Sequence, residues 1–348
     1  MTDIYDLTRL GWSKRLERQL SSEKASLLGL ARISAVHRDQ LLALAPENEI
    51  VLRAAPGHTT GRYAVGDWVR FDPETRRVME TLERKTLLQR RAAGTGAETQ
   101  LIAANVDTLF IVTSCNDDFN LPRLERYLAL AGAAGCLPVF VLTKADMTGD
   151  PQGYQRQAER LSPLATAINL DARDPMEVRS LEPWCRVGET VALVGSSGVG
   201  KSTITNGLTG SLIATQGIRE DDSKGRHTTT SRHLIPTKAG GWVIDTPGMR
   251  ALRLTGSSEG VDAVFSDVAE LASQCRFGDC QHGSEPGCAV QEAIYNGRLD
   301  ADRLARWQKL QIEDARNSRT LAEARAHDRA LSKMYREGQS RGRNKRNS

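Results

Sequence analysis

The sequence of 348 residues contains no long run of apolar residues. A helix that crosses a bilayer needs about 18 or more such residues in a row, so a protein with membrane-spanning helices is excluded. The first residues, MTDIYDLTRLGWSKRL, also lack the apolar stretch of a secretion signal. We therefore expect a cytoplasmic protein that has no membrane partner.

Neither sign of charge dominates, since 47 Lys and Arg stand against 43 Asp and Glu. The net charge of +4 excludes a polycation, so any contact with nucleic acid must come from local patches. Aromatic residues are also few, at 5%, which limits the side chains available for stacking on bases. The apolar share of 39% and the charged share of 26% are typical of a folded globular protein.

Cysteine is scarce and unevenly spread, because three of the six cysteines lie within fourteen residues. The pattern Cys275-x4-Cys280-x-His282-x5-Cys288 offers three thiolates and one imidazole, the ligand set of a tetrahedral zinc site. Four protein ligands leave no open position, so the predicted site is structural; three free thiols are the alternative. The isolated cysteines are expected to pack in the core: Cys115, Cys136 and Cys185.

The hydrophobic pattern changes along the chain. Short alternating runs broken by Pro and Gly, from Ser26 to about Phe71, predict a small antiparallel barrel. The basic stretch from Arg84 to Arg91, followed by Gly94-Thr95-Gly96, resembles a linker. Between about Gln100 and Arg250, apolar strands alternate with helical segments, which predicts a parallel sheet covered by helices.

These changes predict five units, which follow one another without internal repeats. They are a flexible leader (1–25), the barrel (26–95), the α/β domain (96–258), a helical domain with the cysteines (259–336) and a basic disordered tail (337–348).

The strongest local motif lies at residues 195–202, after the strand TVALV and before a helical segment. Its glycines allow the backbone N–H groups to curl inward around phosphate oxygens, and the helix start adds its positive dipole end. A glycine-rich turn without a ligand is the alternative. The predicted phosphate-binding residues are Gly195, Ser196, Ser197, Gly198, Val199, Gly200, Lys201, Ser202 and Thr203, with Lys201 at the β and γ oxygens and Ser202 at Mg²⁺.

Two further motifs fit the same nucleotide. Asp245-Thr-Pro-Gly248 ends the strand WVI, where Asp245 would reach Mg²⁺ through water and the Gly248 N–H would contact the γ-phosphate. Alone, this tetrapeptide could be a simple turn. Thr143-Lys144-Ala-Asp146 ends the strand LPVFVL, and its carboxylate can accept hydrogen bonds from the N1–H and N2–H₂ of guanine but not from adenine.

The guanine motif is weak in isolation, because Asp is a common helix cap. Lys144 could lay its alkyl stem along the base. Combined with the other two motifs, it predicts GTP rather than ATP as the nucleotide. In this chain it precedes the phosphate loop by about fifty residues, whereas it comes last in most GTPases. A parallel sheet can form in either order, because strand neighbours matter more than the position of the chain break.

The rotated order, together with QLIAANVDTLFIVTSCNDDFNLPRLERYL, GRHTTT, DTPG and the cysteine pattern, resembles the ribosome small-subunit-dependent GTPase A family of bacteria. The resemblance extends from about residue 26 to 336. It implies a circularly permuted P-loop GTPase domain between an N-terminal OB-fold barrel and a C-terminal, mainly helical zinc domain. It also implies a GTP hydrolase that is stimulated by the small (30S) ribosomal subunit and acts in its late maturation.

The resemblance suggests roles for residues that local patterns leave open. GRHTTT matches the family's switch motif, so Thr228 or Thr229 is expected at Mg²⁺, and the sequence does not decide between them. Met249 stands where a water-orienting Gln often follows the DTPG motif, which leaves His227 as the catalytic candidate; a solvated loop histidine is the alternative. Asp171-Ala172 best matches the base-side loop, where the family has a Ser-rich turn.

RNA contact is the expected role of the ends of the chain. Residues 1–95 hold 16 basic and 12 acidic residues, and the segment 333–348 holds six basic and one acidic. The family implies 16S rRNA as the partner, with assembly factors possible, and we expect a monomer. Tyr63 and Trp68 could stack on bases, but core packing is the better interpretation for Trp68. A solvated tail is the alternative for residues 333–348.

The predicted function is therefore GTP hydrolysis with Mg²⁺ and Zn²⁺ as cofactors. A zinc-dependent RNA-binding assembly module, in which GTP is only structural, is an alternative from another class. An ATPase is a third.

Overall fold

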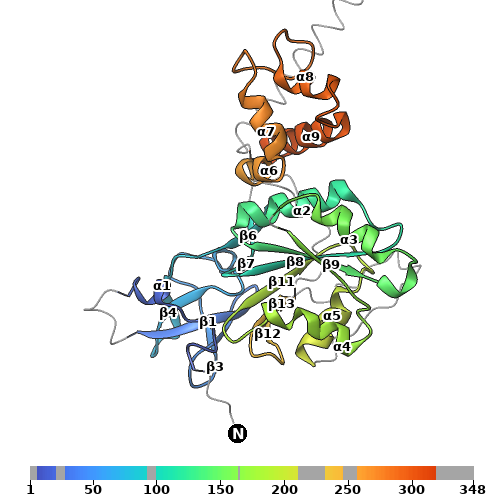
Figure 1. The fold of residues 1–348 in the computed structure, drawn as a ribbon. Helices are drawn as coiled ribbons and strands as arrows, with labels where there is room; N and C mark the ends of the chain where they lie inside the picture. Colours follow the sequence, from blue (N-terminus) through green and yellow to red (C-terminus); the bar gives the residue numbers. More distant parts are fainter. Residues whose placement is uncertain are drawn as a thin grey trace, which may run out of the picture.

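The computed structural model describes residues 6–20, 28–91, 99–163, 165–210, 232–245 and 257–318. Figure 1 shows a group of N-terminal strands beside a larger sheet with helices on both faces, and a set of C-terminal helices stacked against one of these faces. No helix among these residues combines the length and the apolar character that crossing a bilayer requires.

The N-terminal strands pair in an antiparallel manner, as their alternating apolar residues predicted. β1 pairs with β2 and β4, β2 with β3, and β4 with β5. A parallel bridge between Arg53 and Arg77 joins the end of β3 to the start of β5, so the strands close into a barrel. Its strands are β1 (Gly29–Val36), β2 (Leu41–Leu44), β3 (Glu49–Leu52), β4 (Trp68–Asp72) and β5 (Arg77–Thr81), with a 3₁₀ turn at Thr60–Arg62.

The barrel has its own apolar core, to which Ile33, Leu41, Val69 and Phe71 contribute. Tyr63 also belongs to this core and is 4% exposed. Trp68 is 1% exposed and packs at the junction with the larger sheet instead. Both side chains are therefore buried, which confirms core packing for Trp68 and removes these two rings as stacking platforms.

The predicted flexible leader is wrong for residues 6–20, which include the short helix α1 (Lys14–Glu17). Leu10 is fully buried, and Trp12 packs edge-on against Trp68 with ring centroids 5.0 Å apart. Trp242 Nε1 donates a hydrogen bond to Arg9 O, at 2.7 Å. Single apolar residues anchor this segment at the seam between barrel and sheet, which is why it carries no periodic apolar face.

The larger sheet has the strand order β10, β9, β8, β11, β13, β12. The first five are parallel, and β12 is antiparallel to β13. Every residue of β8 and β11 is buried, as expected for strands covered on both faces. The strands are β8 (Thr108–Ser114), β9 (Leu137–Thr143), β10 (Thr166–Asn169), β11 (Thr190–Val194), β12 (His233–Pro236) and β13 (Trp242–Asp245). This arrangement confirms the predicted parallel sheet.

Helices cover both faces of this sheet (Figure 1). One face packs on α2, and the other packs on α4, α5 and a 3₁₀ segment. Local residues set the ends of α2, because Asn120 caps the Arg123 N–H at 3.0 Å and Gly135 ends the helix with φ 75°. The helices are α2 (Leu121–Ala134), α3 (Pro151–Glu159), α4 (Pro175–Val178) and α5 (Lys201–Thr209), with 3₁₀ segments at Ala145–Met147 and Arg179–Trp184.

Barrel and sheet are joined in two ways. β1 continues the large sheet by pairing with β12 at Ala35 and His233. A separate hairpin consists of β6 (Leu87–Arg91) and β7 (Thr99–Ala104), and β6 lies in the basic stretch that the sequence suggested was part of a linker. The predicted boundary at residue 95 lies outside the described residues, while the apolar residues Leu88 of β6 and Ile102 of β7 are fully buried.

The C-terminal helices pack on α2. They are α6 (Ser258–Val264), α7 (Ser266–Ser273), α8 (Ala289–Tyr295) and α9 (Ala301–Ser318). Gly260 approaches α2 so closely that a Cβ there would lie 2.3 Å from Ala129 O. The buried Glu125 of α2 pairs with Arg303 at 3.2 Å and Arg306 at 2.9 Å. Burial raises the pKa of Glu125, and the two guanidinium groups oppose this shift.

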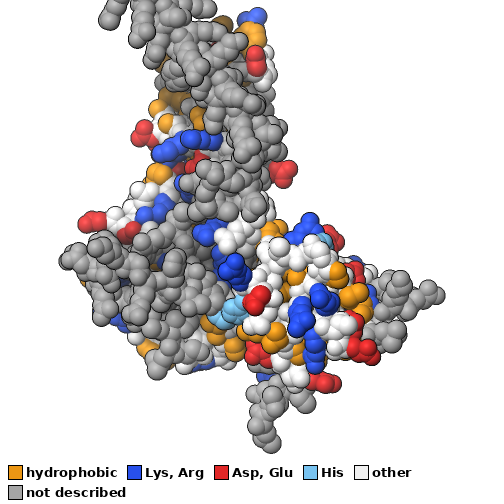
Figure 2. Space-filling model, turned by 180° about the vertical axis from the view of Figure 1, so that it is seen from behind, with side chains coloured by type: hydrophobic (Ala, Val, Ile, Leu, Met, Phe, Trp, Pro, Cys, Tyr) orange, Lys and Arg blue, Asp and Glu red, His pale blue; other side chains and the backbone are white. Residues whose placement is uncertain are grey.

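Basic side chains are not spread evenly over the surface. Figure 2 shows Lys and Arg on the rear face in separate patches among apolar and uncharged side chains. This distribution agrees with the small net charge and leaves local patches as the sites for anionic partners.

Arg32 of β1 is the polar centre of the seam. Its guanidinium is fully buried and donates to Leu10 O at 2.6 Å and to Thr190 Oγ1 at 2.8 Å. Burial lowers the pKa of Arg32 to about 10, although Asp107 and Asp67 act in the opposite direction. One side chain therefore connects the N-terminal segment, the barrel and β11.

We predict that Arg32→Ala lowers the free energy of unfolding by about 3 kcal/mol, because it leaves buried acceptors unpaired and opens a cavity. The midpoint of urea unfolding, followed by far-UV circular dichroism, measures the change. Arg53→Ala, at an exposed barrel position, is the matched control and should stay within about 0.5 kcal/mol. Equal losses for the two variants would contradict this account of the seam.

Candidate functional site

Residues 195–200 form a loop between β11 and α5, and residues 201–202 begin α5, in the strand-to-helix context that the sequence predicted. Gly195, Gly198 and Gly200 have φ of 148°, 78° and 95°, which L side chains rarely adopt. A Cβ at Gly195 would also lie 2.1 Å from Val112 O. The loop therefore needs glycine at these positions, and Gly200 directly precedes the first turn of α5.

Lys201 opens α5, and its side chain folds back over the loop. Its Nζ donates to Gly195 O at 2.9 Å and to Ser196 O. The ammonium is thus held against the same loop whose N–H groups are predicted to hold phosphate. A positive charge at a helix N-terminus is the arrangement that a phosphate anion stabilises.

Thr143 connects the predicted guanine motif to the phosphate loop. Its Oγ1 donates to Val199 O at 2.7 Å and lies 3.2 Å from Thr113 O. The next residue, Lys144, has a left-handed backbone with φ 57°, which turns the chain at the end of β9. Two segments that are about fifty residues apart in sequence are therefore in direct contact.

The base-side residues lie beside these two segments. A Cβ on Gly200 would be 3.5 Å from both Ala172 Cβ and Thr143 Cγ2. Asp146 accepts a hydrogen bond from Arg173 Nη2 at 2.7 Å, and Arg173 also donates to both carboxylate oxygens of Asp171 at 3.0 Å. Residues 143–146, 171–173 and 195–202 thus form one cluster at the carboxyl end of the sheet, where ligands of α/β folds bind.

Sequence reasoning did not identify Arg173, which links the two acidic residues of this cluster. Hydrogen bonds from Arg173 hold the pKa of Asp171 below its usual range, and Asp171 in turn raises the pKa of Arg173. The sequence feature that could have identified Arg173 is its position directly after Asp171-Ala172, the predicted base-side loop.

Asp245 is the last residue of β13, which pairs with β11 in parallel. Because carboxyl ends of parallel strands meet at one edge, Asp245 and the phosphate loop lie on the same edge of the sheet. The other predicted nucleotide and catalytic residues on this side lie outside the described residues: His227, Thr228, Thr229 and Gly248.

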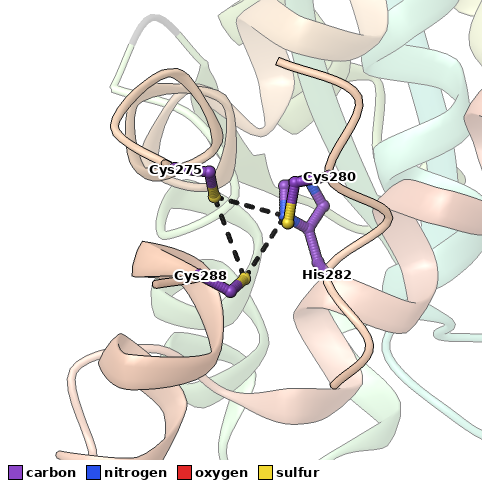
Figure 3. Close-up of side chains that lie close together, drawn as sticks. All are labelled: Cys275, Cys280, His282 and Cys288. Carbon is purple, nitrogen blue, oxygen red and sulfur yellow. Dashed lines mark hydrogen bonds between the residues drawn. The ribbon is translucent and has the colours of Figure 1, made fainter. Parts of the chain in front are cut away.

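The predicted metal ligands come together in the loop between α7 and α8. One ligand atom from each of Cys275, Cys280, His282 and Cys288 lies within 4.8 Å of the others. Figure 3 shows the thiols of Cys275 and Cys288 and the imidazole of His282 facing one another. Cys275 Sγ lies 3.8 Å from Cys288 Sγ, and the two sulfurs lie 3.5 and 3.6 Å from His282 Nδ1.

These distances fit a zinc ion. With Zn–S bonds of about 2.3 Å, the sulfurs of a tetrahedral site are separated by roughly 3.8 Å. The backbone of His282 is left-handed, with φ 58°, and its carbonyl accepts from Gln291 Nε2 at 2.5 Å. Trp307 of α9 packs 5.6 Å from the His282 ring. Residues of α8 and α9 therefore contact His282 and help to fix the orientation of its imidazole.

The isolated cysteines behave as core residues, as predicted. Burial raises the pKa of Cys115 to about 11 and those of Cys136 and Cys185 to about 12. These thiols stay protonated at neutral pH and are poor metal ligands.

The parallel sheet brings together a phosphate loop after β11 and a guanine motif after β9, which comes earlier in the chain. This combination defines a P-loop GTPase of circularly permuted strand order. A sequence model of the family described as RsgA GTPase matches residues 81–255. The chain belongs to this family, and the protein is a GTPase, a hydrolase acting on GTP.

Curated relatives match over most of their length. The chain is 52% identical over 316 residues to the "Small ribosomal subunit biogenesis GTPase RsgA" of Mesorhizobium japonicum, covering 90% of this chain and 91% of the relative. It is 49% identical over 339 residues to the "Small ribosomal subunit biogenesis GTPase RsgA 2" of Vibrio vulnificus, covering 97% and 96%. The resemblance to this family is therefore confirmed.

Solved structures share the fold. YjeQ from Thermotoga maritima aligns with a TM-score of 0.59 at 24% identity, covering 82% of this chain and 97% of that one. YloQ, described as a circularly permuted GTPase, aligns with a TM-score of 0.57 at 23% identity, covering 88% and 99%. Both support the permuted strand order at the level of the fold.

We predict that Thr143→Val weakens GDP binding about tenfold, because it leaves Val199 O without its side-chain donor at the phosphate loop. The isosteric change keeps the packing, and Thr143→Ser, which keeps the hydroxyl, is the control. Fluorescence titration with a labelled GDP measures both. Wild-type affinity in Thr143→Val would show that the loop does not depend on this hydrogen bond.

Proposed function

We propose that this GTPase is stimulated by the small (30S) ribosomal subunit and acts in late maturation or checking of that subunit. The curated relatives carry names that state small ribosomal subunit biogenesis, and they match nearly the whole chain. The observation that supports it most directly is the convergence of residues 143–146, 171–173 and 195–202 around one site. The proposal extends to the partner, the nucleotide contacts and the roles of the two flanking units.

GTP would sit with its phosphates in the loop 195–200, where inward N–H groups and the first turn of α5 stabilise negative charge. Lys201 would leave its carbonyl partners to reach the β and γ oxygens. The residues proposed to hold Mg²⁺ are Ser202, Asp245 through water, and one of Thr228 and Thr229. The ion would neutralise charge that develops on the phosphates.

The base would lie beside Asp146, whose carboxylate accepts from two guanine donors. Lys144 would cover one face of the ring with its alkyl chain. Asp171 and Ala172 supply the backbone next to the base, in place of the Ser-rich turn of the family. Adenine presents no matching pair of donors to Asp146, which supports GTP over ATP.

His227 is proposed to orient the attacking water. Without a Gln after the DTPG motif, and without a cis arginine finger recognisable in sequence, intrinsic hydrolysis is expected to be slow. A partner that orders the switch region would accelerate it, which is the physical basis for stimulation by a ribosomal subunit. The cytoplasm, where ribosomes are assembled in bacteria, is the proposed location.

The barrel is proposed to be an OB-fold that docks on 16S rRNA as part of a monomer. Its pairing, β3-β2-β1-β4-β5 with a bridge from β3 to β5, supports this assignment. Because Tyr63 and Trp68 are buried, phosphate contacts rather than base stacking would supply most of the affinity. The segment 333–348, outside the described residues, would add salt-sensitive contacts.

Zinc is proposed to hold the loop between α7 and α8. Four protein ligands fill a tetrahedral shell, so the ion would be structural rather than catalytic. The alternative for the whole protein is a zinc-dependent RNA-binding module in which GTP is bound but not turned over; subunit-stimulated turnover separates the two.

We predict that purified small subunits raise the GTP turnover rate at least tenfold over that of the free protein, because docking orders the switch region. A malachite-green assay for released phosphate measures the rate, and large subunits are the control. His227→Ala should lose most of the stimulated rate while keeping GDP affinity. No stimulation by small subunits would favour the binding-module alternative.

We predict one tightly held zinc ion per chain. Its removal should melt the C-terminal helices before the sheet, because the three cysteines and His282 then lose the metal ion that holds them together. Native mass spectrometry counts the ion, and circular dichroism after chelation follows the helices. Cys115→Ser, at a core thiol, should keep the zinc, whereas Cys288→Ser should lose it. A metal-free protein with unchanged helical signal would contradict this role.

A further inference from the structure

A cavity of about 360 Å³ lies between the barrel, the β6–β7 hairpin and the start of β12. Its polar lining comes from four separate parts of the chain. His37 stands at the end of β1, Thr60 in the 3₁₀ turn, Arg90 and Gln100 on opposite strands of the hairpin, and Arg232 directly before β12. The cavity therefore lies at the seam of barrel and sheet, and its lining shares no residue with the nucleotide cluster.

The described residues that line this cavity are basic or neutral, and none is acidic. Gln100 orients Arg90, because Arg90 Nε donates a hydrogen bond to Gln100 Oε1 at 2.9 Å. Arg232 donates from Nη1 to Leu101 O at 3.3 Å, and its buried Nε has no acceptor among the described residues. Two guanidinium groups thus face one space in which no carboxylate of the described residues balances them.

The electrostatics agree with this geometry. Burial lowers the pKa of Arg232, and the charge of Arg90 lowers it further. Burial also lowers the pKa of His233, with a smaller contribution from His37, whose ring centroid is 6.4 Å away. Asp245 and Glu49 act in the opposite direction on His233. Placing the charged groups of Arg90 and Arg232 close together in a partly buried space is therefore unfavourable in free energy, and a bound anion would offset this.

We propose that this cavity binds one phosphate group of the ribosomal RNA backbone, held by Arg90 and Arg232. Guanidinium groups match the oxygens of a phosphate through paired N–H donors, and Arg232 Nε would gain the acceptor that it lacks. The cavity is wider than a free ion needs, so the sugar attached to the phosphate can enter. This inference rests on the proposed contact with the small subunit, and it gives that contact a defined site.

The position of the cavity connects RNA to the nucleotide site. Arg232 lies within residues 218–237, the polar loop IREDDSKGRHTTTSRHLIPT that the sequence predicts as the switch. The next residue, His233, pairs with Ala35 of the barrel on one side and with Asp245 on the other. A phosphate held at Arg232 fixes the start of β12, and thereby supports the strand whose last residue is the proposed Mg²⁺-side aspartate.

The test compares Arg90→Gln and Arg232→Gln with Arg160→Gln, which removes the same charge at an exposed position after α3. Binding to small subunits and to naked 16S rRNA is measured by filter binding from low to high salt, with thermal midpoints as the folding control. Each cavity variant should bind small subunits and naked 16S rRNA about tenfold more weakly. The magnitude of the slope of log affinity against log salt concentration should decrease by about one. Arg160→Gln should match the wild type.

Folded cavity variants with wild-type affinity and salt slope would overturn the proposal, even if small subunits stimulate the wild-type GTPase. If small subunits do not stimulate the wild-type GTPase but the variants bind rRNA more weakly, the proposed function is wrong and the phosphate site is supported. Inorganic phosphate distinguishes the source of the anion. If millimolar phosphate raises the thermal midpoint of the wild type but not of Arg232→Gln, and RNA affinity is equal, the cavity takes free phosphate and the RNA assignment is wrong.

Discussion

The hydrogen bond from Thr143 Oγ1 to Val199 O is the contact on which the nucleotide site depends. It joins the end of β9 to the phosphate loop after β11, although the chain visits these strands in an order opposite to that of most GTPases. β8 lies between them in the sheet, so their carboxyl ends meet at one edge whichever strand is made first. The site is thus a property of strand neighbours, and permutation leaves its geometry intact.

Permutation does change which units flank the nucleotide site along the chain. The chain leaves the sheet after β13 and Asp245, and its next described elements are the C-terminal helices. These helices are fixed to α2 by close approach at Gly260 and by the Glu125 pairs with Arg303 and Arg306. The barrel is fixed on another side through Arg32 and the pairing of β1 with β12. The barrel therefore pairs directly with the sheet that carries the nucleotide site, whereas the C-terminal helices pack on a helix that covers this sheet.

Features that depend on neighbouring residues in sequence could be predicted. The glycines of the phosphate loop and the spacing Cys275 to Cys288 specify backbone shape and ligand chemistry locally, and the apolar strands specify burial. Features that depend on distant partners could not. Leu10 and Trp12 are single apolar residues whose role needs Trp68 opposite, and β6, which pairs with β7, lies in a basic stretch with no clear strand pattern. Arg173 becomes notable only when Asp146 is placed beside it.

Asp146 is proposed to read a guanine whose phosphates lie at Lys201, and the affinities of Asp146→Asn for GDP and for xanthosine diphosphate are the sharpest measurement of this role. An amide at this position keeps one acceptor but meets the guanine donors with its own N–H₂, whereas the xanthine oxygen accepts from it. We expect that GDP affinity falls roughly 10- to 100-fold and that xanthosine diphosphate binds better than GDP. Unchanged preference for GDP in the folded variant would contradict it.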